Sequence, residues 1–289
     1  KNFLSGKERS KFEKAFLDTD VINFHEFWDF NIVYLAKLAS TLGTPFFFTF
    51  HGVLNKWSLR QNAVTKKIFL KYIGLHMFKM STGFQFLTLQ EYLEAKNIYN
   101  FSNKSFILQN GIKIKELKDV KKKEKNDVLK ILYLGRFHSK KGLEVIIDSI
   151  NFFKEKKKNI FFRLVGPDSK YGKALKKRIK KEKIEKYISI EEPVYELEKK
   201  IELFVNSDFL ILPSYDEADS MALKESLAYG LPVIITKECK FFDVEKNKIG
   251  FFIDHDPINI YEKISNINCD ENELIEMSKR CVNFATKIY

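Results

Sequence analysis

Two cations follow an apolar run in the second half of the sequence. Arg136 and Lys141 lie in the segment 135–142, which leaves the apolar residues 130–135 and enters a stretch of helical periodicity. Because both lie on one loop, they can converge on a single anion. Arginine offers a planar pair of donors and lysine a point charge, a combination suited to a diphosphate. A basic surface turn has the same composition, so this motif alone leaves both interpretations open.

Two carboxylates follow another apolar run. Glu217 lies in the loop after 209–212, and Glu225, eight residues further on, lies about one turn into a helix that starts at Met221. The backbone N–H groups of Met221 and Ala222 at this helix start can hold phosphate oxygens. Glu225 could accept hydrogen bonds from the hydroxyls of a ribose, and Glu217 from those of a sugar. Two unrelated surface acids are the competing interpretation.

Alternating strands and helices must position these loops. Continuous apolar runs between helical stretches indicate an α/β protein with parallel sheets covered on both faces, whose ligands lie at the carboxyl ends of the strands. The strands are expected near 21–25, 45–50, 85–88, 105–108, 130–135, 160–165, 188–190, 209–212, 233–235 and 250–253. The helices are expected near 31–42, 62–79, 143–156, 196–206 and 221–229, with a basic helix after 165 and two more at the C-terminus.

The pattern predicts two domains. A length of 289 residues fits two domains of ordinary size. Residues 1–112 form a first Rossmann-like block and residues 130–289 a second. The charged segment 113–129 between them lacks apolar periodicity and is expected to be an exposed linker.

Composition excludes several classes of protein. The three cysteines have no CxxC spacing, which argues against a disulfide framework and a zinc site. No apolar run is long enough to span a membrane, and the first residues do not resemble a signal peptide, so a cytoplasmic location is expected. The net charge is +12, of which +10 falls within 154–186. This lysine-rich stretch is either a solvated face or a surface for an anionic membrane; it lacks the interleaved aromatic residues of nucleic-acid readers.

The order of these features resembles the retaining glycosyltransferases of family 4, which have the GT-B fold: two Rossmann-like domains that face each other across a cleft. The resemblance rests on Glu217 and Glu225 as an E-x7-E pattern, on 230–234 as G-x-P-V-I and on the basic loop 135–142. It extends to 24–29, 51–60 and 109–112, and so covers nearly the whole chain.

The resemblance implies a donor site for a nucleotide-sugar, with UDP and GDP the common nucleotides. Arg136 and Lys141 match the basic pair that holds the donor diphosphate. The backbone of Met221 and Ala222 matches a second phosphate contact. Glu225 matches the carboxylate on the donor ribose.

The resemblance also implies how the sugar is transferred. Glu217 matches the carboxylate that faces the transferred sugar, and His51 matches a histidine that reaches this sugar from the first domain. Transfer retains the anomeric configuration and uses neither a metal nor another cofactor. The acceptor is expected to be a glycan or a lipid-linked sugar, in the synthesis of a bacterial surface polysaccharide at the membrane. His25, at the end of the neighbouring strand, either touches substrate or makes a structural hydrogen bond; His255 is expected to be exposed.

The chain departs from the family pattern in two respects. Residues 218–220 read Ala-Asp-Ser where the family has glycine and an aromatic residue, and Asp219 is expected to add negative charge beside the diphosphate. The first block lacks the family's opening strand and glycine-rich loop, and the chain stops before its usual final helix. The sequence is therefore expected to be a fragment of a longer enzyme. A nucleotide-sugar epimerase on the same fold and a noncatalytic binding domain are the alternatives.

Overall fold

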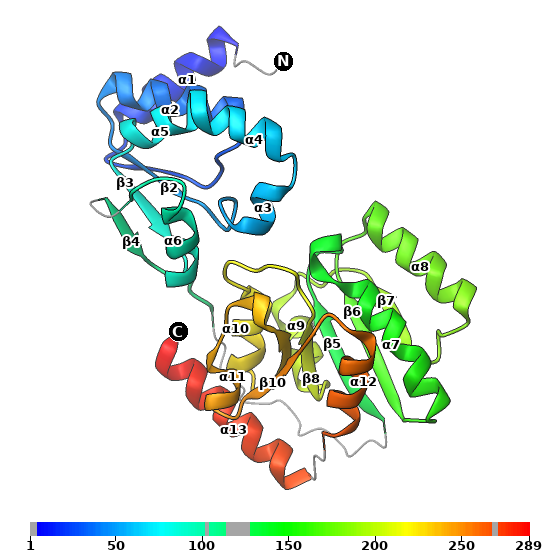
Figure 1. Cartoon of the computed structure of the whole chain (residues 1–289). Coiled ribbons are helices and arrows are strands. Elements are labelled where there is room, and N and C mark those ends of the chain that lie inside the picture. Colours follow the sequence, from blue (N-terminus) through cyan, green and yellow to red (C-terminus); the bar gives the residue numbers. More distant parts are fainter. Residues whose placement is uncertain (1–4, 102–103, 114–127, 268–270) are drawn as a thin grey trace. The chain divides into compact units, whose positions relative to one another are not determined.

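The chain divides into two compact units. The computed structural model describes residues 5–101, 104–113, 128–267 and 271–289. Unit 1 comprises Lys1–Asn110 and unit 2 comprises Gly111–Tyr289 (Figure 1). Most of the expected linker, 113–129, lies outside the described residues. No helix of the described residues is long and apolar enough to cross a membrane.

Unit 1 contains a four-stranded parallel sheet in the order β1-β2-β3-β4. Its strands are β1 (Ile22–Phe24), β2 (Phe46–Thr49), β3 (Gly83–Phe86) and β4 (Ser105–Ile107). Its helices are α1 (Gly6–Leu17), α2 (Phe30–Leu42), α3 (Lys56–Arg60), α4 (Ala63–Phe69), α5 (Leu75–Met80) and α6 (Leu89–Lys96), and a π-helical segment, η1 (Leu70–Gly74), joins α4 to α5. The expected long helix over 62–79 is therefore confirmed, with a π-helical insertion at its middle.

Local capping residues fix the ends of these helices. At the start of α2, the Asp29 side chain accepts a hydrogen bond from the Asn31 N–H at 2.6 Å. The helix ends at Gly43, whose φ of 76° is a left-handed conformation that suits glycine. Ser5 and Glu8 form a capping box at the start of α1. Helices α1 and α6 were not expected from the apolar pattern, because α1 is mostly polar and exposed and α6 is only eight residues long.

Phenylalanine dominates the core of unit 1. It supplies eleven of the eighteen buried residues of this cluster. Phe50, directly after β2, lies with its ring centroid 5.4–6.1 Å from those of six other phenylalanines: Phe27, Phe48, Phe78, Phe84, Phe86 and Phe101. Close ring pairs of this kind stabilise a core beyond the burial of their area. This packing anchors the carboxyl end of β2, where His51 follows.

Unit 2 contains a six-stranded parallel sheet in the order β10-β9-β8-β5-β6-β7. Its strands are β5 (Leu129–Leu134), β6 (Ile160–Val165), β7 (Ile188–Glu191), β8 (Phe209–Leu212), β9 (Val233–Thr236) and β10 (Gly250–Ile253). The expected α/β class with parallel sheets is thus confirmed in both units. Strand β5 pairs with both β6 and β8, so the strand order reverses beside it. Such a switch point is where open α/β sheets bind ligands.

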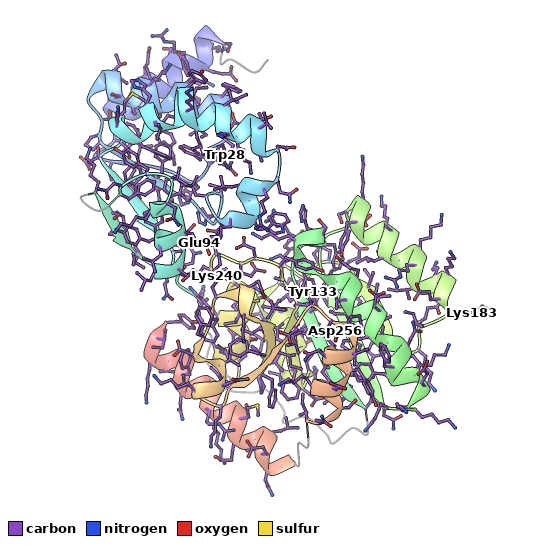
Figure 2. All side chains as sticks on the ribbon, in the orientation of Figure 1. Trp28, Glu94, Tyr133, Lys183, Lys240 and Asp256 are labelled. Atoms are coloured by element: carbon purple, nitrogen blue, oxygen red, sulfur yellow. The ribbon has the colours of Figure 1, made fainter. Side chains whose placement is uncertain are left out.

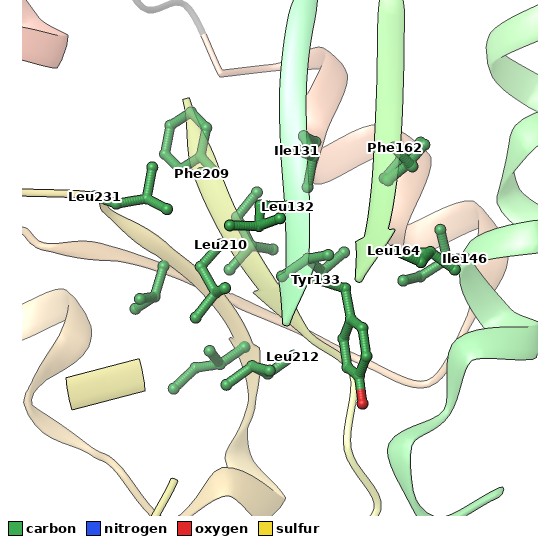
Figure 3. Close-up of a cluster of buried hydrophobic side chains, with 14 of the residues drawn as sticks. Ile131, Leu132, Tyr133, Ile146, Phe162, Leu164, Phe209, Leu210, Leu212 and Leu231 are labelled. Atoms are coloured by element: carbon green, nitrogen blue, oxygen red, sulfur yellow. The ribbon is translucent and has the colours of Figure 1, made fainter. Parts of the chain in front are cut away.

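Helices cover the sheet of unit 2. They are α7 (Leu143–Glu155), α8 (Lys170–Glu182), α9 (Leu197–Val205), α10 (Met221–Ala228), α11 (Asp243–Lys246), α12 (Pro257–Ser265) and α13 (Glu271–Ile288), with short 3₁₀ turns η2 (Ser139–Lys141) and η3 (Lys237–Cys239). Helix α12 packs beside α7, and α13 packs on α10 (Figure 1). Figure 3 shows the apolar side chains of β5, β6 and β8 that fill the sheet between these layers.

Truncation of Phe50 tests the core of unit 1. Phe50→Ala is expected to lower the free energy of unfolding of this unit by about 3–5 kcal/mol, because the ring leaves a cavity among six others. Phe30→Ala is the matched control, since 61% of Phe30 is exposed; its effect should stay within about 0.5 kcal/mol. Urea unfolding followed by circular dichroism measures both. Equal effects of the two substitutions would contradict this description of the core.

Candidate active site

The loops after β5, β6 and β8 contact one another through their backbones. A Cβ atom at Gly142, whose φ is 63°, would lie 2.1 Å from the carbonyl oxygen of Pro213. A Cβ atom at Gly166 would lie 2.0 Å from the carbonyl oxygen of Gly135. Both distances are far below contact, so only glycine permits these approaches. The Tyr215 N–H also donates to the Lys140 carbonyl at 2.8 Å. The basic loop and the acidic loop therefore lie together at the switch point.

Lys141 and Glu217 meet in this contact. The Lys141 Nζ atom lies 2.5 Å from Oε1 of Glu217, and the Ser214 hydroxyl donates to the same oxygen at 2.7 Å. Both charged side chains are largely buried, with 19% and 10% exposed. The two residues expected to hold a diphosphate and to face a sugar are thus brought together as a partly buried ion pair.

A buried thiol lies near this pair. Burial raises the pKa of Cys239 to about 12, and the charge of Glu217 acts in the same direction. The Cys239 thiol also donates to the Leu212 carbonyl at 3.4 Å. A thiol with so high a pKa is inert at neutral pH, so Cys239 is a packing residue rather than a nucleophile.

Asp216 pairs with lysines from two different loops. Its carboxylate lies 2.7 Å from Nζ of Lys140 and 2.7 Å from Nζ of Lys240. Lys140 comes from the loop after β5 and Lys240 from the turn after β9, so the loops after β5, β8 and β9 are connected by one buried acid. Figure 2 labels Lys240.

Asp219, expected to add negative charge beside the diphosphate, is paired with a buried lysine. Its carboxylate pairs with the Lys224 ammonium at 2.6 Å, and the two side chains are only 5% and 3% exposed. The Lys224 Nζ atom also lies 5.0 Å from the ring centroid of Tyr289, within reach of a cation–π interaction. The substitution of an acid at 219 is accommodated by a lysine one helical turn along α10.

Glu225 and the start of α10 form the next part of the site. The Ser220 side chain caps the helix by accepting from the Leu223 N–H at 3.4 Å. The N–H groups of Met221 and Ala222, as the first of a helix, have no acceptor within it. Glu225 pairs with the Lys200 ammonium at 2.6 Å and is partly buried. Glu225, the expected ribose contact, is therefore paired with a lysine from α9.

Tyr133 supports the loop that carries Arg136. Figure 3 shows its phenol oxygen pointing past the carboxyl end of β5. This hydroxyl donates to the Arg136 carbonyl at 2.8 Å. Burial, reinforced by the charge of Glu217, raises the pKa of Tyr133 well above its ordinary value, so the hydroxyl stays a donor. The Arg136 side chain itself is exposed.

His255 is a site residue that the sequence did not reveal. It was expected to be exposed, but it is half-buried, and its ring stacks on Tyr215 with centroids 4.0 Å apart. Its Nε2 atom lies 3.2 Å from the Ser214 carbonyl. His255 follows β10, two strands from β8, and no motif spacing relates it to the loop it contacts.

The ion pairs of this cluster contain more lysines than carboxylates. Five lysines (Lys140, Lys141, Lys200, Lys224 and Lys240) pair with four carboxylates (Asp216, Glu217, Asp219 and Glu225). Each of these lysines is a cation that an anionic ligand could share with its carboxylate.

In unit 1, His25 and His51 meet at the ends of β1 and β2. The His25 Nδ1 atom lies 2.8 Å from Nε2 of His51, and the rings stack with centroids 5.1 Å apart. One ring donates the hydrogen bond and the other accepts it. Of the two roles left open for His25, the structure shows a hydrogen bond, and its partner is the candidate site residue His51. His51 has a φ of 49°, a conformation uncommon for residues other than glycine and found often at functional sites.

Glu91 holds the loop of His51 in place, and sequence reasoning missed it. The carboxylate is fully buried and accepts hydrogen bonds from the Gly52 N–H at 2.5 Å and the Leu87 N–H at 2.7 Å. Thr88 caps α6 by accepting from the Glu91 N–H at 3.1 Å. The T-x-x-E pattern of residues 88–91 is that of a capping box, and it could have marked both the helix and this glutamate.

Two parallel-sheet α/β units with a cluster of charged loops at the switch point of the second are the features of GT-B glycosyltransferases, and the comparisons agree. The chain belongs to the family glycosyl transferases group 1, whose model matches residues 114–288. An uncharacterized glycosyltransferase of Methanocaldococcus jannaschii is 24% identical over 203 residues, which are 70% of this chain and 52% of that protein. The chain thus spans about half the length of this curated relative.

Solved structures share the whole fold. HepE of Anabaena, in complex with UDP and glucose, superposes with a TM-score of 0.78 at 14% identity, over 100% of this chain and 80% of that one. Sucrose-phosphate synthase of Thermosynechococcus elongatus gives a TM-score of 0.74 at 14% identity, over 100% and 76% of the two chains. At these identities the likeness shows the fold, and it confirms the GT-B class expected from the sequence.

The buried Asp219–Lys224 pair can be tested by a double-mutant cycle. Asp219→Leu or Lys224→Met alone should each cost about 3–5 kcal/mol of unfolding free energy, because each leaves a buried charge without its partner. The double variant should be closer to the unsubstituted protein than either single one. The exposed pair Glu276–Lys279 is the control, with side chains 54% and 64% exposed; its removal should cost less than about 1 kcal/mol. Additive single effects would contradict the pairing.

Glu91 gives a second test. Glu91→Gln replaces one acceptor oxygen by an amide that cannot accept from a backbone N–H, and it should destabilise unit 1 by about 1–3 kcal/mol. Glu26→Gln, at an exposed glutamate of the same unit, is the control and should change little. Hydrogen exchange of the Gly52 and Leu87 amides provides the specific measurement: both should exchange faster in Glu91→Gln. Unchanged exchange would rule out the proposed restraint on the His51 loop.

Proposed function

We propose that this chain carries the donor site of a retaining glycosyltransferase that moves a sugar from a UDP- or GDP-sugar to a glycan or lipid-linked acceptor. The observation that carries the proposal is the Lys141–Glu217 pair beside the start of α10, within a cluster of lysine–carboxylate pairs. HepE, which shares the fold, was solved with UDP, with UDP and glucose and with UDP-glucose. The E-x7-E spacing of Glu217 and Glu225 is the support for proposing family 4 in particular.

Donor binding requires the ion pairs of the site to rearrange. In this proposal, Arg136, Lys141 and the first N–H groups of α10, those of Met221 and Ala222, hold the diphosphate. Because Lys141 contacts Glu217, it must share or leave this carboxylate to reach a phosphate. Glu225 accepts the ribose hydroxyls, and it must likewise loosen its contact with Lys200. The five lysines of these ion pairs are cations that an entering phosphate can share with their carboxylates.

Transfer then breaks the bond between the anomeric carbon and the diphosphate oxygen. Arg136, Lys141 and the helix start stabilise the negative charge that develops on the leaving diphosphate, as preorganised donors do in other transferases. The acceptor hydroxyl forms the new bond on the same face of the sugar and gives its proton to the leaving phosphate. Glu217 orients the sugar, and His51 contacts it from unit 1. The proposed reaction needs no metal and no other cofactor.

We also place the reaction in the cytoplasm at the inner face of the membrane, in the assembly of a bacterial surface polysaccharide. The support is the lysine-rich composition and a lipid-linked acceptor of the kind that such assembly uses.

Calorimetry with UDP, GDP and ADP tests the donor site. One nucleotide should bind selectively, and Arg136→Ala and Glu225→Ala should each weaken its binding about tenfold or more, the loss expected for one charge-assisted hydrogen bond. Arg178→Ala, on α8, is the matched control and should bind normally. A folded protein that binds none of the three nucleotides would refute the proposal.

Glu217→Gln separates binding from transfer. Since the substitution removes the carboxylate that holds Lys141, nucleotide binding should be unchanged or tighter, while sugar transfer to an acceptor should fall by more than about tenfold. Weaker nucleotide binding in Glu217→Gln would show that Glu217 supports the diphosphate site rather than the sugar. An epimerase would interconvert the donor without any acceptor, and a binding domain would do neither.

A further inference from the structure

Segment 56–80 of unit 1 carries positive charge without a single carboxylate. It contains six cations (Lys56, Arg60, Lys66, Lys67, Lys71 and Lys79) and no aspartate or glutamate. It forms α3, α4, η1 and α5. Solvated helices commonly alternate charges and gain ion pairs between residues four apart. The helices of this segment contain no acidic residue of their own for such a pair.

Large apolar side chains are exposed on α4 and on the η1 segment that continues it. Val64, Ile68 and Tyr72 are spaced four residues apart, and their exposed fractions are 74%, 55% and 70%, respectively. Residues four apart share one side of a helix. Lys67 and Lys71, each next to one of the apolar residues, are exposed as well, and the Lys71 Nζ atom lies 5.2 Å from the ring centroid of Tyr72. We call these five residues the α4 face.

The opposite side of the helix packs inward. Phe69 is buried in the core of unit 1. Lys66 donates to the Ser58 carbonyl at 2.6 Å and lies over the ring of Trp28, and burial lowers its pKa. Figure 2 labels Trp28 within unit 1. The helix is thus anchored by one side, and the α4 face is not needed for its own packing.

We infer that the α4 face docks unit 1 on an anionic lipid bilayer. A helix that combines exposed apolar side chains with lysines beside them lies in the interface of a membrane: the apolar groups enter the acyl boundary, and the ammonium groups meet lipid phosphates. Each lysine near an anionic surface adds to the attraction. The inference rests on the proposed function for its biological sense and deepens it, since it names the surface that brings the enzyme to a lipid-linked acceptor.

Two alternatives fit the charges and side chains less well: a second copy of the chain on this face, and helix α8 as the membrane-binding surface. A second copy of the chain, docked face to face, would bring two clusters of uncompensated lysines together. The basic helix α8 is the other surface considered for a membrane, but none of its residues is among the exposed large apolar side chains, and Lys173 has an acidic partner, Asp168. Lys183, which follows α8, lies at the periphery of unit 2 (Figure 2). Helix α8 therefore offers charge without a group that inserts.

Flotation with vesicles tests the inference on the full chain. The protein should float with vesicles of phosphatidylcholine and phosphatidylglycerol in equal parts and much less with phosphatidylcholine alone. The triple variant Val64→Ser/Ile68→Ser/Tyr72→Ser should lower the partition coefficient at least about tenfold. The double variant Lys67→Glu/Lys71→Glu should lower it more than about a hundredfold, because two charges reverse sign and the net charge of the surface falls by four units.

The matched control reverses two exposed lysines of α8. Lys177→Glu/Lys180→Glu has the same net charge as the double variant of the α4 face and should keep binding within about threefold. Equal losses in the two double variants would overturn the inference, because net charge and not the α4 face would then govern binding. So would normal flotation of the triple variant, or a change in its oligomeric state without a change in flotation.

Nucleotide calorimetry on the same variants distinguishes this inference from the proposed function. The α4-face variants should bind nucleotide as the unsubstituted protein does, because the donor site lies in unit 2. Normal nucleotide binding with no flotation would reject the docking surface alone. Normal flotation with no nucleotide binding would reject the donor site alone. Thermal melting of each variant checks that unit 1 remains folded.

Discussion

The site depends on the close backbone contact between the loops that follow β5 and β8. Gly142 faces the Pro213 carbonyl at a distance that no side chain would permit. Only through this contact does Lys141 reach Glu217, and only there can Lys140 reach Asp216. The strand order of the sheet makes the contact possible, since β5 pairs directly with β8 although about 75 residues separate them. The charges therefore meet because the glycine in the loop and the order of the strands together bring the two loops into contact.

In unit 2, the buried acids of the site are paired with lysines. Each carboxylate from Asp216 to Glu225 has a lysine partner, and the partners come from α9, α10 and the loops after β5 and β9. A buried acid without such a partner would carry a large desolvation cost. The same lysines are cations that an anionic ligand can recruit. The ion pairs thus offset the cost of burying these acids, and under the proposed function the same lysines would exchange a carboxylate for a phosphate.

Most of the fold could be predicted from the pattern of apolar residues. The strands of unit 2 are mostly apolar, and three of them, 160–165, 209–212 and 250–253, have the predicted bounds. The pattern failed for α1, whose polar and exposed surface gives a weak apolar period, and for α6, which is only eight residues long. Their capping residues, Ser5 with Glu8 and Thr88, were the remaining local signals.

The sequence by itself determined the α/β class, the loops that carry chemistry and the types of charged residue on them, because these follow from the periods of strands and helices and from spacing within one loop. The tertiary structure decided which charges are paired. Neither the link of Asp219 to Lys224 nor the burial of Glu91 beneath the His51 loop has a sequence spacing that identifies it as a contact. The position of His255 over Tyr215 likewise depends on the order of strands. Pairing energies depend on distance and burial in space, and only the folded chain sets these.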